Sequence, residues 1–376
     1  MPVFGNYNFH SHTYRCGHAA NVDDEEFILE AVKYGYKKYG ISDHVPVHPI
    51  FYWDKRMRMH DREKEEYLSS IEELKKTYAD SIEILSGFEA EYDEIIEAYL
   101  CDLRDKCDYM ILGQHYILGK DIRHTVGYPL EYAKKVCKAI ESGIFDIVAH
   151  PDIFMQYRYG IEEKDKDEYI ENCKKASKKI CEKAKEYDIP LELNLGGFYG
   201  GKIESEPRYP TNLFWTEVSK VGNKVVVGID AHFLEAIANR EEKLQFISTY
   251  IDLDNLNFLS NSYDPFQSRV DNQKLHSAYK KTKDNATCVE RRLIASYLDE
   301  VLIESSIDCL NDLIVKLEDS SKYMVDSHQY IYETYCRRKK LAGILKDSRD
   351  ELSNTMLKED FINFIKDYVE KNINSC

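Results

Sequence analysis

Short apolar runs alternate with longer amphipathic stretches over about residues 1–250, and this alternation constrains the fold more than any other feature of the chain. The amphipathic stretches space their apolar residues three and four positions apart, as in Ile170, Cys173 and Ala176, which is typical of helices that bury one face. Strand-like runs that alternate with helices predict βα units and a parallel sheet, here closed into a barrel. The seven runs span residues 3–12, 37–44, 82–91, 108–116, 145–150, 189–197 and 224–232.

The alternation stops after residue 250. Residues 251–270 are rich in Asp, Asn and Ser and contain a proline, so we predict a linker or long loop there. Residues 271–376 have a helical pattern and are expected to form an all-α extension of unknown role. Within it, the stripe from Ile303 to Leu317 has the spacing of a coiled coil. We interpret this stripe as a helix packed on its neighbours, with the seam of a homodimer as the alternative.

Polar side chains gather where the apolar runs end. His10 and His12 close the first run and Asp230 and His232 close the seventh, and residues two apart share one face of a strand. His18 follows in a glycine-containing loop that can fold back over the same edge. The carboxyl ends of parallel strands meet at one rim of a barrel, where catalytic residues lie. The residues expected at this rim are His10, His12, His18, His44, Glu89, His115, His150, Asp230 and His232.

These nine side chains predict a metal centre. Neutral imidazole and ionised carboxylate are natural ligands of zinc, iron and manganese. A zinc ion usually takes about three to five donors, so nine donors would serve two or three divalent ions. Glu89, with two oxygens, is the natural bridge between ions. Closely spaced ions suit hydrolysis of a phosphate ester, although carbonyl and amidine hydrolysis stay open at this point.

The order and spacing of these residues resemble the PHP (polymerase and histidinol phosphatase) superfamily over about residues 1–250. The motifs that carry the resemblance are His10-x-His12-x5-His18, SDH ending in His44, GFE ending in Glu89, His115, HPD beginning at His150, and DAH from Asp230 to His232. The resemblance implies an α/β fold, a distorted (β/α)7 TIM-like barrel, with the all-α region added at its end. It further implies three ligand sets, which are His10, His12, Glu89 and Asp230; Glu89, His115 and His150; and His18, His44 and His232.

Within that superfamily, GFEAEY (87–92), LELNLGG (191–197), EPRYP (206–210) and GIDAH (228–232) resemble the histidinol-phosphate phosphatases. The resemblance implies a metal-dependent phosphatase acting on a small phosphomonoester, best L-histidinol phosphate, in histidine biosynthesis. A phosphoesterase for nucleotides or oligonucleotides is the first alternative. A binding or regulatory protein that acts through its helical tail is the second.

Residues beyond the nine would complete the site. Arg158 lies eight residues past His150 and would grip a phosphate with its fork of donors, with Arg208 and Arg15 as rivals. Asn194 ends the sixth run and would orient substrate or water, or act as a structural cap. We expect Glu89, Asp230 and Arg158 to be catalytic and Arg158, Arg208 and Asn194 to bind substrate. Asp43, beside His44, is expected to support a ligand from behind.

Composition narrows the setting. The formal charge of −16 disfavours long nucleic acids as partners but not a small phosphorylated substrate. No window approaches the roughly 18 uncharged apolar residues of a membrane span, and the first residues lack the pattern of a signal peptide. The ten cysteines include no CxxC pair, which indicates reduced thiols. We therefore expect a cytoplasmic protein without a membrane partner.

Overall fold

The computed structural model describes residues 4–46, 57–59, 63–117, 122–198 and 207–286. Its sheet has eight parallel strands in sequential order from β1 to β8. The strands are β1 Tyr7–Asn8, β2 Lys38–Ile41, β3 Glu83–Ala90, β4 Tyr109–Leu112, β5 Ile147–Val148, β6 Leu191–Asn194, β7 Lys224–Gly228 and β8 Asn257–Phe258. The central strands β4 and β6 are buried at every residue, as expected for a parallel sheet covered on both faces.

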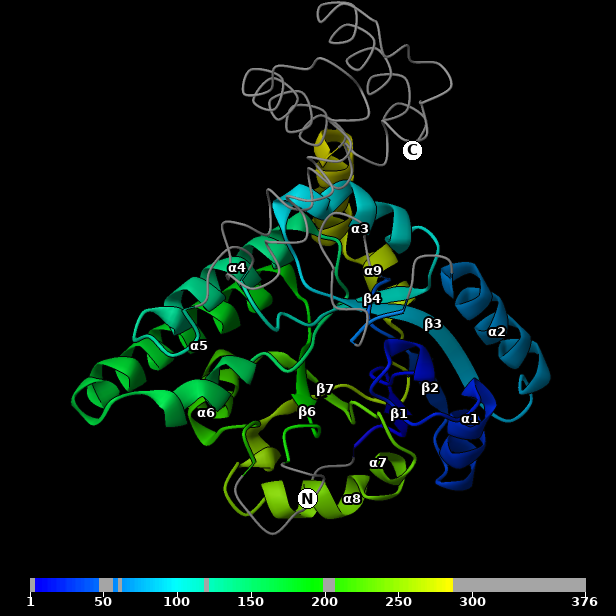
Figure 1. Ribbon diagram of the computed structural model, residues 1–376, viewed down its shortest axis with the longest axis horizontal. Helices are drawn as coiled ribbons and strands as arrows, with labels where there is room; N and C mark the ends of the chain where they lie inside the picture. The colour runs from blue at the N-terminus through cyan, green and yellow to red at the C-terminus, as the bar shows by residue number, and fades with distance from the viewer. Residues whose placement is uncertain (1–3, 47–56, 60–62, 118–121, 199–206, 287–376) are drawn as a thin grey trace, which may run out of the picture.

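Helices connect the strands and lie outside the curled sheet (Figure 1). They are α1 Asp24–Lys33, α2 Lys64–Thr77, α3 Glu97–Arg104, α4 Tyr128–Ser142, α5 Lys166–Tyr187, α6 Asn212–Val221, α7 Glu235–Ala238, α8 Arg240–Ile247 and α9 Pro265–Asp271. Local sequence sets their ends. Helix α4 has a proline in its first turn and ends at Gly143, whose φ of 68° lies in the left-handed region that suits a glycine at a helix end.

The sheet curls until its first strand returns to its seventh. Ser11, beyond β1, forms a parallel bridge with Ala231, beyond β7, and the His12 amide donates to the Ala231 carbonyl at 2.9 Å. At the other end of β7, Lys224 and Val225 pair with β8 instead. The distorted TIM-like barrel is therefore confirmed, with a short eighth strand at the amino-terminal end of the seam between β1 and β7.

Two apolar clusters hold this arrangement. The larger one lies between the sheet and the helices and contains most of the buried aliphatic side chains. The smaller one fills the barrel interior and includes Tyr7, Phe9, Tyr109 and Ile147. The Tyr109 hydroxyl donates to the Phe9 carbonyl at 2.9 Å, so the buried phenol has a partner. This interior cluster forms a packed floor beneath the carboxyl ends of the strands.

The segment expected to be a linker, 251–270, contains β8 and most of α9, which corrects the expectation for these residues. Its polar residues act as helix signals, because the Asp264 side chain accepts from the Gln267 amide and Pro265 occupies the first turn of α9. Arg269 of α9 then pairs with the buried Asp146 at 3.2 Å. The segment is thus tied to the barrel rather than hanging between two domains.

Residues 273–286 are helical, and the Tyr279 hydroxyl donates to the Asp105 carboxylate at 2.6 Å. The stripe from Ile303 to Leu317, the homodimer expected through it and the role of the tail lie outside the described residues, so these stay predictions. Among the described residues, no helix combines the length and the apolar character needed to cross a membrane.

Candidate metal centre

All nine predicted side chains converge at the carboxyl ends of the strands. Four overlapping groups of them place one nitrogen or oxygen of each member within 4.8 Å of the others. The groups are His10, His12 and Glu89; His44, Glu89 and His115; His18, His44 and His232; and His10, His150 and Asp230. The rim therefore concentrates imidazoles and carboxylates contributed by six of the strands and the loop after β1.

Glu89, in β3, is the hub of this cluster. Its Oε1 lies 2.8 Å from His150 Nε2 and 3.5 Å from His115 Nε2. Its Oε2 lies 3.0 Å from His44 Nδ1 and 3.5 Å from His10 Nε2. The two oxygens thus face different histidines, which is the geometry a bridging carboxylate needs.

Asp230 contacts the histidines that follow β1 and β7. Its Oδ1 lies 3.2 Å from His12 Nε2, 3.4 Å from His10 Nε2 and 3.3 Å from His232 Nδ1. His232 in turn approaches His18, with 2.8 Å between their Nε2 atoms. His18 reaches this position because its loop turns at Gly17, whose φ is 79°.

Two of the nine residues have unusual backbones. His150 has a φ of 28° and Asp230 a φ of 49°, in a region that L-residues rarely occupy. Such conformations cost about 1–3 kcal/mol each and persist where the surroundings impose them. The fold therefore keeps two unfavourable backbone conformations that direct these side chains into the centre.

Three buried carboxylates support the histidines from behind. His10 Nδ1 lies 2.9 Å from Glu192 Oε1, His115 Nδ1 lies 2.9 Å from Glu91 Oε1, and His12 Nδ1 lies 3.5 Å from Asp43 Oδ1. Outer partners of this kind orient metal-binding imidazoles and select their tautomer. Asp43 was expected in this role, whereas the sequence analysis missed Glu91 and Glu192. Their signal was a carboxylate two residues from another polar residue, within a buried strand for Glu192 before Asn194 and directly after one for Glu91 after Glu89.

Charges in the cluster shift pKa values in opposite directions. Burial acts to raise the pKa of Glu89, but His44, His115 and His10 outweigh it and hold the pKa well below its ordinary value. Burial also acts to lower the pKa of His12, yet the surrounding carboxylates raise it to about 9. Burial lowers the pKa of His18 to about 4, and neighbouring His232 adds to the effect. The metal-free centre therefore combines charged and neutral imidazoles with ionised carboxylates.

The donor atoms fit a cluster of divalent ions. His10 Nε2, His12 Nε2, His44 Nδ1 and Asp230 Oδ1 are buried without a hydrogen-bond partner. Buried polar atoms normally have partners, and leaving one unsatisfied costs about 1–3 kcal/mol. Several such atoms facing one another would be satisfied together by cations. Imidazole and carboxylate donors of this kind suit zinc, iron and manganese.

Cys16 is a further neighbour that the sequence analysis did not single out. Its sulfur belongs to a group with His12 and His232 within the same 4.8 Å limit. The side chain is buried, and burial raises the pKa of the thiol to about 12. In the metal-free protein the Cys16 thiol is therefore protonated at neutral pH.

The residues expected to bind substrate lie in different settings. Arg158 donates to the carbonyls of Met155 and Arg208 at 3.0 and 2.8 Å, and so holds the segment that carries Arg208 and Tyr209. The Tyr209 ring lies 5.9 Å from the His150 ring, and Arg208 is exposed beside it. This places both arginines near the rim, and their contact with a substrate stays a prediction.

Asn194 points inward. Its Nδ2 donates to Glu192 Oε2 at 2.8 Å, and its Oδ1 accepts from the Gly196 amide at 2.7 Å. Arg15, the other arginine considered, is buried in pairs with Asp24 and Glu66 at 2.8 Å each. Both side chains therefore already have hydrogen-bond or ion-pair partners within the protein.

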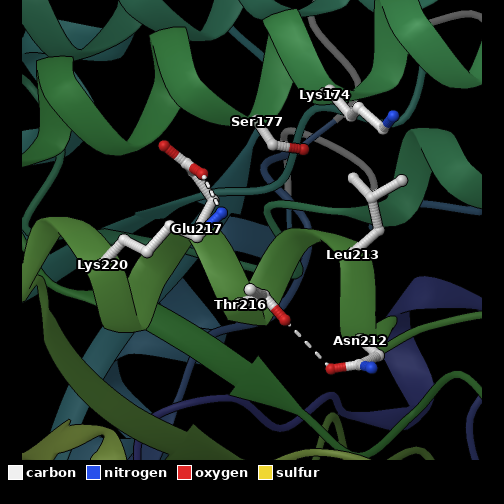
Figure 2. Close-up of a pocket in the computed structure, with 7 residues that line it drawn as sticks. All are labelled: Lys174, Ser177, Asn212, Leu213, Thr216, Glu217 and Lys220. Atoms are coloured by element: carbon white, nitrogen blue, oxygen red, sulfur yellow. Dashed lines mark hydrogen bonds and ion pairs between the residues drawn. The ribbon is translucent and has the colours of Figure 1, made fainter.

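A separate cavity of about 220 Å³ lies on the outside of the barrel between α5 and α6 (Figure 2). Its lining includes Lys174, Ser177, Thr216 and Lys220. Lys220 pairs with Glu217 at 3.4 Å, and Lys174 pairs with Glu171 at 3.6 Å. The lysine charges are thus locally balanced, and none of the residues that line this cavity is one of the nine at the rim.

Comparisons with known proteins identify the family to which the fold belongs. A family model described as the PHP domain matches residues 8–195. A Proteus mirabilis protein named "Probable phosphatase PMI1003" is 24% identical over 247 residues, which span 64% of this chain and 84% of that protein. The histidinol-phosphatase of Bacillus subtilis is 29% identical over 115 residues, which span 29% of this chain and 43% of that protein.

A solved structure gives the same fold. It is the histidinol phosphate phosphatase of Lactococcus lactis in complex with zinc, L-histidinol and phosphate. The match has a TM-score of 0.52 and covers 68% of this chain and 96% of that one, at 15% identity. At this identity the likeness supports the architecture and leaves the ligands as properties of the Lactococcus protein.

Proposed function

From the premise that this chain belongs to the PHP domain family and is a phosphoric monoester hydrolase, we propose that it hydrolyses L-histidinol phosphate to L-histidinol and phosphate. The observation that carries the phosphatase chemistry is the convergence of nine imidazole and carboxylate side chains on one rim. The substrate is suggested by the names of the Bacillus and Lactococcus relatives. This reaction would place the protein in histidine biosynthesis.

We further propose that the nine side chains hold two or three divalent ions of zinc, iron or manganese. His10, His12, Glu89 and Asp230 would hold one; Glu89, His115 and His150 a second; and His18, His44 and His232 a third. The last set coincides with one of the close groups of donor atoms, and Glu89 belongs to two of them. Bound ions would supply Lewis-acid stabilisation of charge on the phosphoryl oxygens.

The chain's own residues would orient this chemistry. Glu89 keeps its two oxygens on separate histidines, so its carboxylate sets the spacing between ligand sets. Asp230 directs a buried, unpartnered Oδ1 to the same space. Arg158 and Arg208 border the rim through the segment that contains Tyr209, and there a guanidinium would pair with phosphate oxygens. Asn194 would act on the substrate only through the groups it orients.

The experiment is phosphate release from L-histidinol phosphate and from a panel of nucleotides, with zinc or manganese supplied. His12→Ala removes a proposed ligand, and we expect a loss of more than about 100-fold in kcat/KM, beyond the loss typical of an outer partner. His276→Ala is the matched control, because His276 is exposed on the helix 273–286, away from the rim.

Faster turnover of histidinol phosphate than of any nucleotide, lost in His12→Ala and kept in His276→Ala, would support the proposal. Faster turnover of a nucleotide than of histidinol phosphate would overturn the proposed substrate but would leave the proposed metal site in place. No metal-dependent phosphate release from any compound would refute the phosphatase assignment.

A further inference from the structure

We propose that Glu192 is a positioning residue that holds two of the proposed metal ligands, His10 and His150, at once. It belongs to none of the three ligand sets above. The inference rests on the proposed metal centre and is independent of which phosphate ester is the substrate.

Glu192 first sets the ring of His10. It lies in β6 with 2% of its surface exposed, and its Oε1 and Oε2 lie 2.9 and 3.1 Å from His10 Nδ1. The carboxylate accepts a hydrogen bond there, so Nδ1 carries the hydrogen. Nε2 is then the nitrogen left to bind an ion, and it faces Glu89 and Asp230 at 3.5 and 3.4 Å. One contact thus selects both the tautomer and the orientation that a ligand requires.

Glu192 also holds the backbone of His150. The His150 amide donates to Glu192 Oε2 at 2.8 Å. This is the residue whose φ is 28°, and the turn brings its Nε2 to 2.8 Å from Glu89 Oε1. This buried hydrogen bond stabilises a backbone conformation that is otherwise unfavourable.

The carboxylate itself is held in place. Asn194, two residues along β6, donates from Nδ2 to Glu192 Oε2 at 2.8 Å. On the other side, a Cβ at Gly228 would stand 1.7 Å from Glu192 Oε1. The neighbouring strand β7 therefore leaves room for the carboxylate only because residue 228 is a glycine.

Charge gives an independent reason. Glu91, behind His115, pairs with Arg58 at 2.5 Å. Among the described residues, Glu192 has no lysine or arginine partner, and its ion pair is with His10. Burying a carboxylate without a fixed cation is costly, so a positive centre reached through His10 would stabilise Glu192.

The test is zinc affinity of the full chain, measured by competition with a chelator, for wild type and Glu192→Gln. We expect affinity to fall about 10–100-fold, the usual effect of losing such a partner. The absorption bands of the cobalt-loaded protein should also shift, because they report the ligand geometry. Glu97→Gln is the matched control. Glu97 lies on α3, is half-buried, accepts a hydrogen bond from the Tyr92 hydroxyl and contacts none of the nine residues.

A second measurement needs no variant and covers the case in which Glu192→Gln fails to fold. In zinc-loaded wild type, nitrogen NMR of labelled histidine should find the proton of His10 on Nδ1; a proton on Nε2 would overturn the inference. Wild-type zinc affinity and an unchanged cobalt spectrum in folded Glu192→Gln would overturn it too, leaving the metal centre intact. Wild type that binds no zinc would refute the metal centre and this inference together.

Discussion

Gly113→Ala should disable the centre by adding one methyl group. Gly113 follows β4, and a Cβ built on it would stand 1.8 Å from Glu89 Oε1 and 2.4 Å from Glu89 Cδ. Contact at 3.4 Å is ordinary, so the carboxylate oxygen would have to retreat by about 1.6 Å. Metal–ligand distances tolerate only about 0.2 Å, so a displaced Glu89 could not keep its place between two ligand sets.

The size of the effect follows from that displacement. Overpacking of a buried site costs about 1–3 kcal/mol, which would lower the free energy of unfolding of the metal-free protein by that amount. Zinc affinity should fall by more than about 100-fold, because Glu89 is itself a proposed ligand rather than an outer partner. Phosphate release should fall in parallel.

Zinc stoichiometry, chelator competition and phosphate release would be measured on Gly113→Ala beside Gly127→Ala. The second variant is the control, since nothing lies within 4 Å of a Cβ at Gly127. Gly127→Ala should behave as wild type. Wild-type zinc affinity and turnover in Gly113→Ala would refute the reasoning that Glu89 needs this space.

Four further predictions rest on the contacts described. Asp43→Asn weakens the support of His12 Nδ1, so zinc affinity should fall about 10–100-fold by chelator competition; an unchanged value would contradict that role. The raised pKa of His12, about 9, means that the metal-free protein holds a proton there at neutral pH, so apparent zinc affinity should rise with pH up to about 9. The same shift stabilises the metal-free protein fully below the unfolded value of about 6.5 and is lost as pH rises through about 9, which thermal melts at several pH values would detect, whereas melts that show no such loss would count against it. Arg269→Ala leaves Asp146 paired with Arg104, so it should cost about 1.5–3 kcal/mol in chemical denaturation. It should not change kcat, because α9 contacts the barrel away from the rim; a lower kcat with unchanged stability would contradict this.

Sequence patterns were enough to predict the alternation of strands and helices and the nine imidazole and carboxylate side chains at the strand ends. Both follow from local rules, because apolar periodicity reports secondary structure and side chains two apart share a strand face. The pairs His10 and His12, and Asp230 and His232, could therefore be assigned to one rim before any contact was known. Parallel topology did the rest, since it brings all carboxyl ends to the same side.

The tertiary structure alone decided what surrounds those donors. Glu192 approaches His10 across 182 residues of chain, and Gly113 and Gly228 leave the space that two carboxylates occupy. Closure of the barrel between Ser11 and Ala231, with β8 at the other end of the seam, likewise depends on strand pairing between distant segments. Sequence spacing carries no information about such approaches, because they depend on how separate strands are packed side by side rather than on the period of any one strand.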